Sequence, residues 1–91
     1  MSEVKDNPAR SRFEMVEAGQ VVFADYRRDG SRLIIDHVEA PMALRGTGAA
    51  GRFMEGLVGE ARREGATLVP LCSYAAAWLQ RHPKLAQDVT G

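Results

Sequence analysis

The chain has 91 residues and a mass of 10.0 kDa, which is enough for one hydrophobic core and therefore for one domain. Its 45% hydrophobic and 26% charged residues are typical of a globular protein and exclude the disordered and fibrous classes. Twelve basic residues balance twelve acidic ones, so no excess charge favours nucleic acid or an anionic membrane as a partner.

The start of the sequence has no secretory leader, and no apolar run is long enough to span a bilayer, which predicts a cytoplasmic protein. Cys72 is the only cysteine, which excludes an internal disulfide and a multi-cysteine zinc site. No metal cofactor is expected.

Residues 1–11 are polar and lack hydrophobic periodicity, which predicts a flexible N-terminal tail before a single domain at residues 12–91. Alternating apolar and polar residues then predict strands at 12–17, 20–27 and 32–40. The dipeptides Ala18-Gly19 and Asp29-Gly30 separate these strands and favour tight turns. The three strands are therefore expected to form an antiparallel meander.

Between residues 48 and 64, apolar residues recur at steps of three and four, which predicts one amphipathic helix. Gly65 is expected to end this helix in a left-handed conformation. Residues 66–72 predict a buried strand, in which pairing should fail near Pro70 because proline has no N–H.

Ser73 is a candidate N-cap for a second, short helix, which His82-Pro83 should end because the residue before proline avoids the helical region. One more turn is expected after Pro83. This order of elements predicts an α+β (mixed α/β) fold with one crossover helix between the third and fourth strands.

A glycine-rich segment, Arg45-Gly46-Thr47-Gly48-Ala49-Ala50, directly precedes the first predicted helix. Gly46 and Gly48 have no Cβ, so several backbone N–H groups can converge on an anion at the positive end of the helix. Arg45 adds a full charge, which makes the segment suitable for a pyrophosphate. The alternative is that the glycines only make a turn and that Arg45 is solvated.

This segment matches the R/Q-x-x-G-x-G/A loop of the GNAT acetyltransferases, and the predicted order of elements resembles the minimal core of that fold. The stretches DHVEAPMALRGTGAA, PLCSY and WLQRHP resemble a branch of small, single-domain GNAT-like proteins, over roughly residues 12 to 88. The sequence departs from that branch at Lys84-Leu85, where an acidic-aromatic pair is expected.

The resemblance implies acetyl-coenzyme A as cosubstrate. Its pyrophosphate would be held by Arg45, Gly46, Thr47, Gly48, Ala49 and Ala50. Its pantetheine arm would lie between the strands at 32–40 and 66–72, with its amides paired to the backbone of Val38 and Glu39.

Three residues are candidates for catalysis. Cys72 precedes the second helix, whose positive end favours a thiolate; the alternative is a small buried hydrophobe. His37 is a candidate base, although it shares its parity along the strand with Leu33 and Ile35 and is equally suited to packing against the core. The resemblance makes Tyr74 a candidate proton donor to the departing thiolate, with aromatic packing beside Trp78 as the alternative.

Together these features predict an acetyl-coenzyme A-dependent N-acetyltransferase that acts on a primary amine, either a small molecule or a protein lysine. Transfer would be direct or would pass through Cys72. The alternative, from a different class, is a non-catalytic module that binds coenzyme A or another protein. The sequence specifies neither the acceptor nor the oligomeric state.

Overall fold

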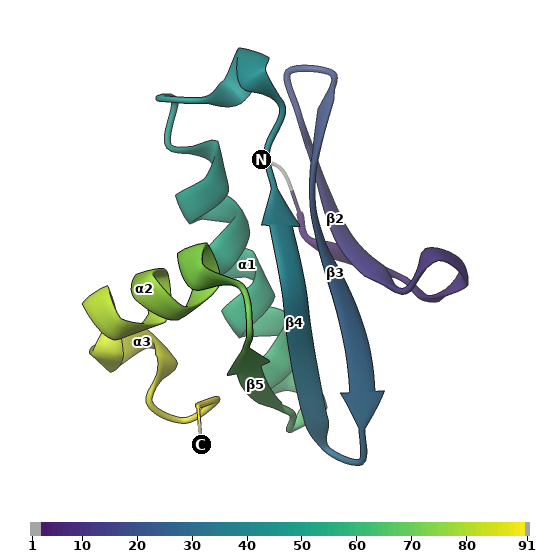
Figure 1. Ribbon diagram of the computed structural model, residues 1–91, viewed down its shortest axis with the longest axis vertical. Coiled ribbons are helices and arrows are strands. Elements are labelled where there is room, and N and C mark those ends of the chain that lie inside the picture. Colours follow the sequence, from purple (N-terminus) through teal and green to yellow (C-terminus); the bar gives the residue numbers. More distant parts are fainter. Residues whose placement is uncertain (1–2, 91) are drawn as a thin grey trace.

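The computed structural model describes residues 3–90, which form a mixed α+β fold with helices packed on one sheet (Figure 1). Its strands are β1 (Lys5–Asn7), β2 (Arg12–Glu17), β3 (Gln20–Asp29), β4 (Arg32–Glu39) and β5 (Thr67–Pro70). Its helices are α1 (Ala49–Glu64), α2 (Ser73–Arg81) and α3 (Pro83–Ala86), with short 3-10 turns η1 (Pro8–Arg10) and η2 (Met42–Leu44).

The strands of this part of the chain form a single sheet in the order β1-β2-β3-β4-β5. The first four strands pair antiparallel, and β5 joins β4 in parallel after the crossover through α1. The predicted α+β fold and its three-strand meander are therefore confirmed. Pairing of β5 ends at Pro70, which faces Ile35, as the missing N–H of proline predicts.

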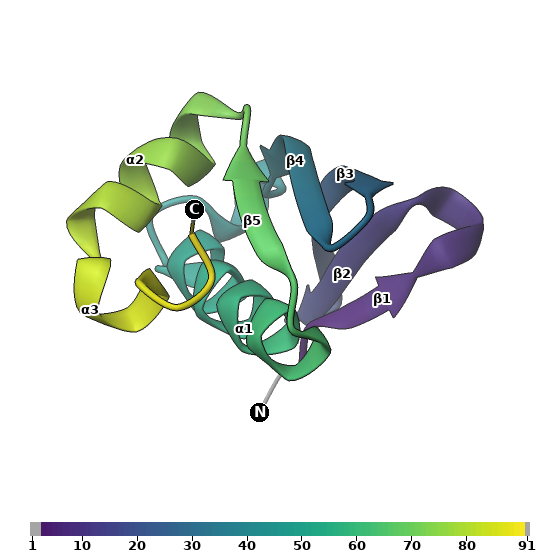
Figure 2. The same ribbon diagram turned by 90° about the horizontal axis from the view of Figure 1, so that it is seen from below.

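Helix α1 covers one face of the sheet, while α2 and α3 lie beyond the β5 edge (Figure 2). The apolar stripe of α1, including Phe53, Met54 and Leu57, is fully buried against inward-facing strand residues such as Phe13 and Leu33. Gly65 ends the helix at φ +69°, and its N–H bonds to the carbonyls of the last turn, as predicted.

The N-terminal segment differs from the predicted tail. Residues 5–7 form β1, which pairs with β2 at the edge of the sheet, and Val4 is buried. A Cβ added at Gly56 would lie 2.3 Å from Val4 Cγ2, so this glycine in α1 makes room for the segment. A strand of three polar residues has too little hydrophobic pattern to be detected in the sequence. Residues 1 and 2 of the predicted tail lie outside the described part of the chain.

The second helix begins one residue earlier than its predicted cap implies. Its N-cap is Cys72, with extended backbone angles, and Ser73 is its first residue. Helix α2 ends at His82, as expected. The His82 N–H donates to the Leu79 carbonyl, and the His82 Nδ1 lies 2.8 Å from the Trp78 carbonyl. The extra turn predicted after Pro83 is α3.

Candidate functional site

The glycine loop between η2 and α1 has the backbone conformation that its sequence predicts. Gly46 and Gly48 adopt φ +80° and +83°, where any residue with a Cβ is strained. Between them, Thr47 ties the loop to the preceding turn, since both its N–H and its hydroxyl donate to the Leu44 carbonyl, at 3.2 and 2.5 Å.

Several backbone donors of this loop are left free by the protein. Within residues 3–90, the N–H groups of Gly46, Gly48, Ala50 and Gly51 donate to no protein acceptor. The first hydrogen bond of α1 runs from the Arg52 N–H to the Gly48 carbonyl, at 3.1 Å. These free N–H groups lie at the positive end of a 16-residue helix, a combination that suits an anion.

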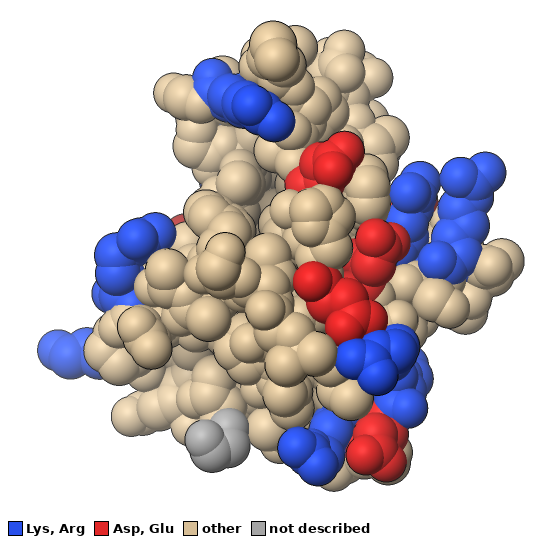
Figure 3. All heavy atoms as spheres, in the orientation of Figure 1, with Lys and Arg blue, Asp and Glu red and all other residues tan. Residues whose placement is uncertain are grey.

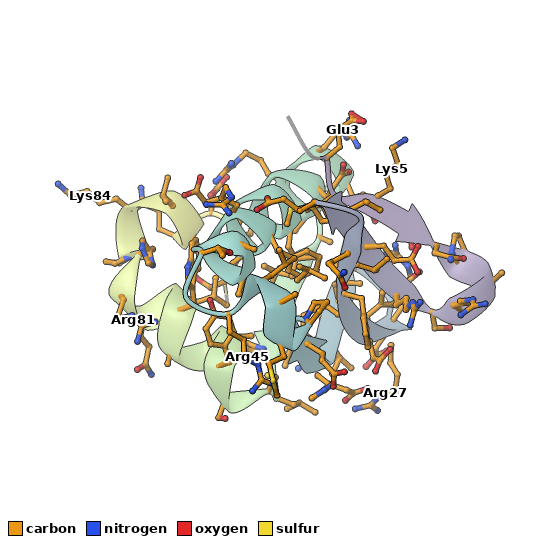
Figure 4. All side chains as sticks on the ribbon, turned by 90° about the horizontal axis from the view of Figure 1, so that it is seen from above. Glu3, Lys5, Arg27, Arg45, Arg81 and Lys84 are labelled. Carbon is orange, nitrogen blue, oxygen red and sulfur yellow. The ribbon has the colours of Figure 1, made fainter. Side chains whose placement is uncertain are left out.

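Arg45 adds an exposed positive charge beside these donors. Its side chain is exposed, and it forms no ion pair with any residue that the structure describes. Figure 4, seen from above, shows Arg45 between the helical side of the molecule, marked by Arg81 and Lys84, and the strand side, marked by Arg27.

The sheet opens next to this loop because β5 leaves β4 early. The N–H groups of Leu71 and Cys72 both donate to the Ile35 carbonyl, at 2.9 and 3.2 Å, and the chain then turns into α2. Strand β4 continues to Glu39, and no strand of the described chain pairs with its last residues on the β5 side. The backbone of β4 between Ile35 and Glu39 therefore has no strand neighbour on this side, next to the glycine loop.

A cavity of about 290 Å³ occupies this opening, and a notch is visible there between the upper end of the molecule and α2 (Figure 3). Its lining brings together six of the candidate residues with Ala40: His37, Val38, Glu39, Arg45, Ala50 and Tyr74. Gly46, Thr47, Gly48 and Ala49 belong to the adjoining loop and helix start, with Ala49 buried. Cys72 is not among the lining residues.

His37 does not pack against the core, which corrects one of the two readings of its position. In the pairing of β3 with β4, Asp25 faces His37 and Tyr26 faces Ile35, so Asp36 is an extra, bulged residue. The bulge reverses the alternation of inward and outward side chains. Val38 therefore packs against the core, whereas the His37 and Glu39 side chains are 53% and 55% exposed.

The side chain of His37 contacts the carboxylate of Glu39, a residue expected above only to bind pantetheine through its backbone. Its Nε2 lies 3.0 Å from Glu39 Oε1 on the same exposed face. When the neutral ring donates its Nε2 proton to Glu39, Nδ1 is left with a lone pair that can accept a proton. The i, i+2 spacing on a strand is the signal that could have found this pair.

Cys72 and Tyr74 lie at the start of α2, and both are half-buried and pack against the hydrophobic core. Only Tyr74 borders the cavity. Burial raises the pKa of its phenol above the usual value, so the group stays protonated at neutral pH. Trp78, the packing partner expected for Tyr74, stacks on His82, with 4.0 Å between the ring centroids.

The described residues contain neither a metal site nor a membrane-spanning helix. No group of three or more His, Cys, Asp or Glu side chains within residues 3–90 is placed to hold a metal ion. None of the helices in this region has the length and apolar character needed to cross a membrane.

A second cavity, of about 650 Å³, is larger than the one beside the glycine loop. It lies beside β5 between Arg32 and Pro83, and none of the candidate residues lines it.

Comparisons with known proteins agree with this geometry. The model of the family described as GCN5-related N-acetyl-transferase matches residues 12–89. Among solved structures, the NMR solution structure of a GCN5-like protein from Staphylococcus aureus has a TM-score of 0.66 and 22% sequence identity. That match covers 98% of this chain and 87% of the other. A search of curated proteins finds no match.

Proposed function

Since this chain belongs to the GCN5-related N-acetyl-transferase family, we propose that it transfers the acetyl group of acetyl-coenzyme A to a primary amine. The observation that carries the proposal is the opening between β4 and β5 directly beside the free N–H groups of the glycine loop. One end of this site suits a phosphate, and the other suits an amide-bearing arm.

The cosubstrate would be held at two places. Arg45 and the free N–H groups of Gly46, Gly48 and Ala50 would bind the pyrophosphate, because they combine an exposed charge with donors at a helix start. The N–H groups of Thr47 and Ala49 instead hold the loop in shape, through the Leu44 carbonyl and the Thr47 hydroxyl. The pantetheine amides would bond to the backbone of Val38 and Glu39, where β4 has lost its strand neighbour. Both places border the same cavity, which supports one continuous ligand.

The reaction then needs one bond to form and one to break. The neutral amine nitrogen attacks the thioester carbonyl, a C–N bond forms, and the C–S bond breaks to release coenzyme A as a thiolate. The attacking nitrogen gives up a proton to a base, and the thiolate takes up a proton from an acid. Backbone N–H groups of β4 near Val38 would stabilise the oxyanion of the tetrahedral intermediate.

His37 and Tyr74 would supply the two proton transfers. The Glu39 contact favours the His37 tautomer whose Nδ1 accepts a proton from the amine. Tyr74, whose phenol is protonated at neutral pH and whose pKa burial raises further, would protonate the thiolate. Direct transfer is favoured over an acyl-enzyme on Cys72, because Cys72 does not line the cavity.

Calorimetric titration with coenzyme A, followed by a mass-spectrometric acetylation assay on a panel of primary amines, tests the proposal. Wild-type protein should bind coenzyme A, and Arg45→Ala should weaken binding by about tenfold, the effect of losing one charged contact. Lys84→Ala is the matched control, because this exposed cation lies on α3 and outside the cavity.

Binding without acetylation of any amine would instead support a non-catalytic module. No binding at millimolar coenzyme A would contradict the proposal altogether.

A further inference from the structure

A second arginine contacts the glycine loop, and its role differs from that expected of Arg45. Arg52 lies one turn into α1, and its Nη1 donates to the Thr47 carbonyl at 3.1 Å. Its backbone N–H donates to the next carbonyl of the loop, that of Gly48, also at 3.1 Å. One residue therefore binds two consecutive carbonyls of the loop.

These bonds determine where the N–H groups of the loop point. In a trans peptide unit, the carbonyl and the following N–H point in opposite directions. When Arg52 binds the Thr47 carbonyl, the Gly48 N–H of the same peptide unit must point away from Arg52. That N–H is one of the donors that find no acceptor within residues 3–90.

Arg52 is itself held by a residue from a distant part of the sequence. Its Nε donates to Glu17 Oε2 at 3.0 Å, and its Nη2 contacts the second carboxylate oxygen. Glu17 is the last residue of β2, before the turn at Ala18 and Gly19, and its side chain is only 22% exposed. Figure 1 shows this turn and the start of α1 at the same end of the molecule.

The Arg52 guanidinium lies directly against Gly48. A Cβ at Gly48 would lie 3.1 Å from Arg52 Nη1, which is closer than ordinary van der Waals contact, so a larger residue would push the guanidinium away from its present place. The mutual hydrogen bond raises the pKa of Arg52 and lowers the pKa of Glu17, so both groups are charged at neutral pH.

We propose that Glu17 and Arg52 are positioning residues, which hold the Thr47–Gly48 peptide so that its N–H faces the pyrophosphate. Arg52 contacts the loop on the side away from this N–H, and Glu17 contacts Arg52, so neither residue would bind the ligand directly. The assignment of a phosphate to the loop rests on the function proposed above, whereas the ordering of the loop by Arg52 does not.

The test compares Arg52→Met and Glu17→Gln with Arg63→Met and Glu60→Gln. The control pair, Arg63 and Glu60, is an ion pair near the other end of the same helix, in which the arginine is exposed and the glutamate is about as buried as Glu17. Affinity is measured for coenzyme A and for pantetheine, which has the same arm without the pyrophosphate. Order of the loop is measured by ¹⁵N relaxation of Gly46 and Gly48.

We expect Arg52→Met and Glu17→Gln to weaken coenzyme A binding by about tenfold, with pantetheine binding within a factor of two of wild type. The ¹⁵N order parameters of Gly46 and Gly48 should fall in both variants. Arg52→Lys should restore part of the affinity, since a lysine keeps the charge but loses the fork that binds Glu17 and Thr47 together. The two control variants should behave as wild type.

Two failures are distinguishable. If wild-type protein binds no coenzyme A, the phosphate site is refuted, and the relaxation data still decide whether Arg52 orders the loop. If coenzyme A and pantetheine lose affinity equally, or if the loop keeps its order without Arg52, the positioning role is wrong.

Discussion

Of the two glycines in the middle of α1, only Gly59 should stabilise the protein when it is replaced by alanine. At an exposed helix position, Gly→Ala stabilises a protein by about 1 kcal/mol. Gly59 meets this condition, because a Cβ there would find nothing within 4 Å. At Gly56 a Cβ would lie 2.3 Å from Val4 Cγ2 and 3.1 Å from Val4 Cβ, whereas carbon atoms pack best at roughly 3.5 to 4.0 Å.

Overpacking of this kind costs about 1–3 kcal/mol, which outweighs or cancels the helix gain at Gly56. Gly56→Ala should therefore be neutral to about 2 kcal/mol destabilising, and Gly59→Ala about 1 kcal/mol stabilising. Urea unfolding followed by circular dichroism measures the unfolding free energy of both variants. In thermal unfolding, their melting temperatures should differ by at least about 4 °C.

Val4→Ala should relieve the contact, so the Val4→Ala/Gly56→Ala double variant should be more stable than the two single effects predict. If Gly56→Ala stabilises the protein as much as Gly59→Ala, the N-terminal segment does not pack against α1 as described.

Three further predictions concern the loop, the acid sensitivity and the cysteine. Gly48→Ala and Gly30→Ala place a methyl group at φ +83° and +61°, so each should cost about 1–2 kcal/mol in urea unfolding, but only Gly48→Ala should abolish coenzyme A binding in calorimetry. Arg27 lowers the pKa of Asp36 through a hydrogen bond, so this carboxylate stabilises the fold above its usual pKa, and that contribution is lost as the pH falls through the lowered value. Asp36→Asn should therefore reduce the loss of unfolding free energy below about pH 4, and an unchanged loss of stability in acid would exclude this role. Cys72→Ser should keep acetyl transfer within about threefold of wild type, a difference of under 1 kcal/mol, and mass spectrometry should detect no acetyl group on Cys72; a loss of all activity would instead favour the acyl-enzyme route.

Most of the fold follows from hydrophobic periodicity and turn residues. The helix expected at residues 48–64 is observed at Ala49–Glu64, because six apolar residues on one stripe and Gly65 at its end fix both its face and its limit. Pro70 ends the pairing of β5 for a covalent reason, the missing N–H, which is equally readable in the sequence.

The departures arise where structure depends on partners far along the chain. The polar strand β1 is defined by its pairing with β2 and by Val4, which fits against a glycine more than 50 positions later. The bulge at Asp36 is a property of two strands, so parity along β4 alone could not show that His37 turns outward.

The candidate site, too, could be predicted only in part. The glycine loop beside Arg45 could be predicted, because left-handed backbone angles demand glycine. The contact of Glu17 with Arg52 could not be predicted, because the two residues are 35 positions apart and no sequence pattern connects them. For the contact of His37 with Glu39, the i, i+2 spacing on a strand was the available signal.

The glycine loop and the open end of β4 should bind one molecule of acetyl-coenzyme A together. A ¹H–¹⁵N NMR titration with the cosubstrate tests this binding, since it reports on each N–H group separately. We predict saturable shifts concentrated at Val38, Gly46, Gly48 and Ala50, with the β3–β4 turn at Gly30 unmoved. Shifts that are absent from the loop at saturation, or that gather in the hollow beside β5, would contradict the claim.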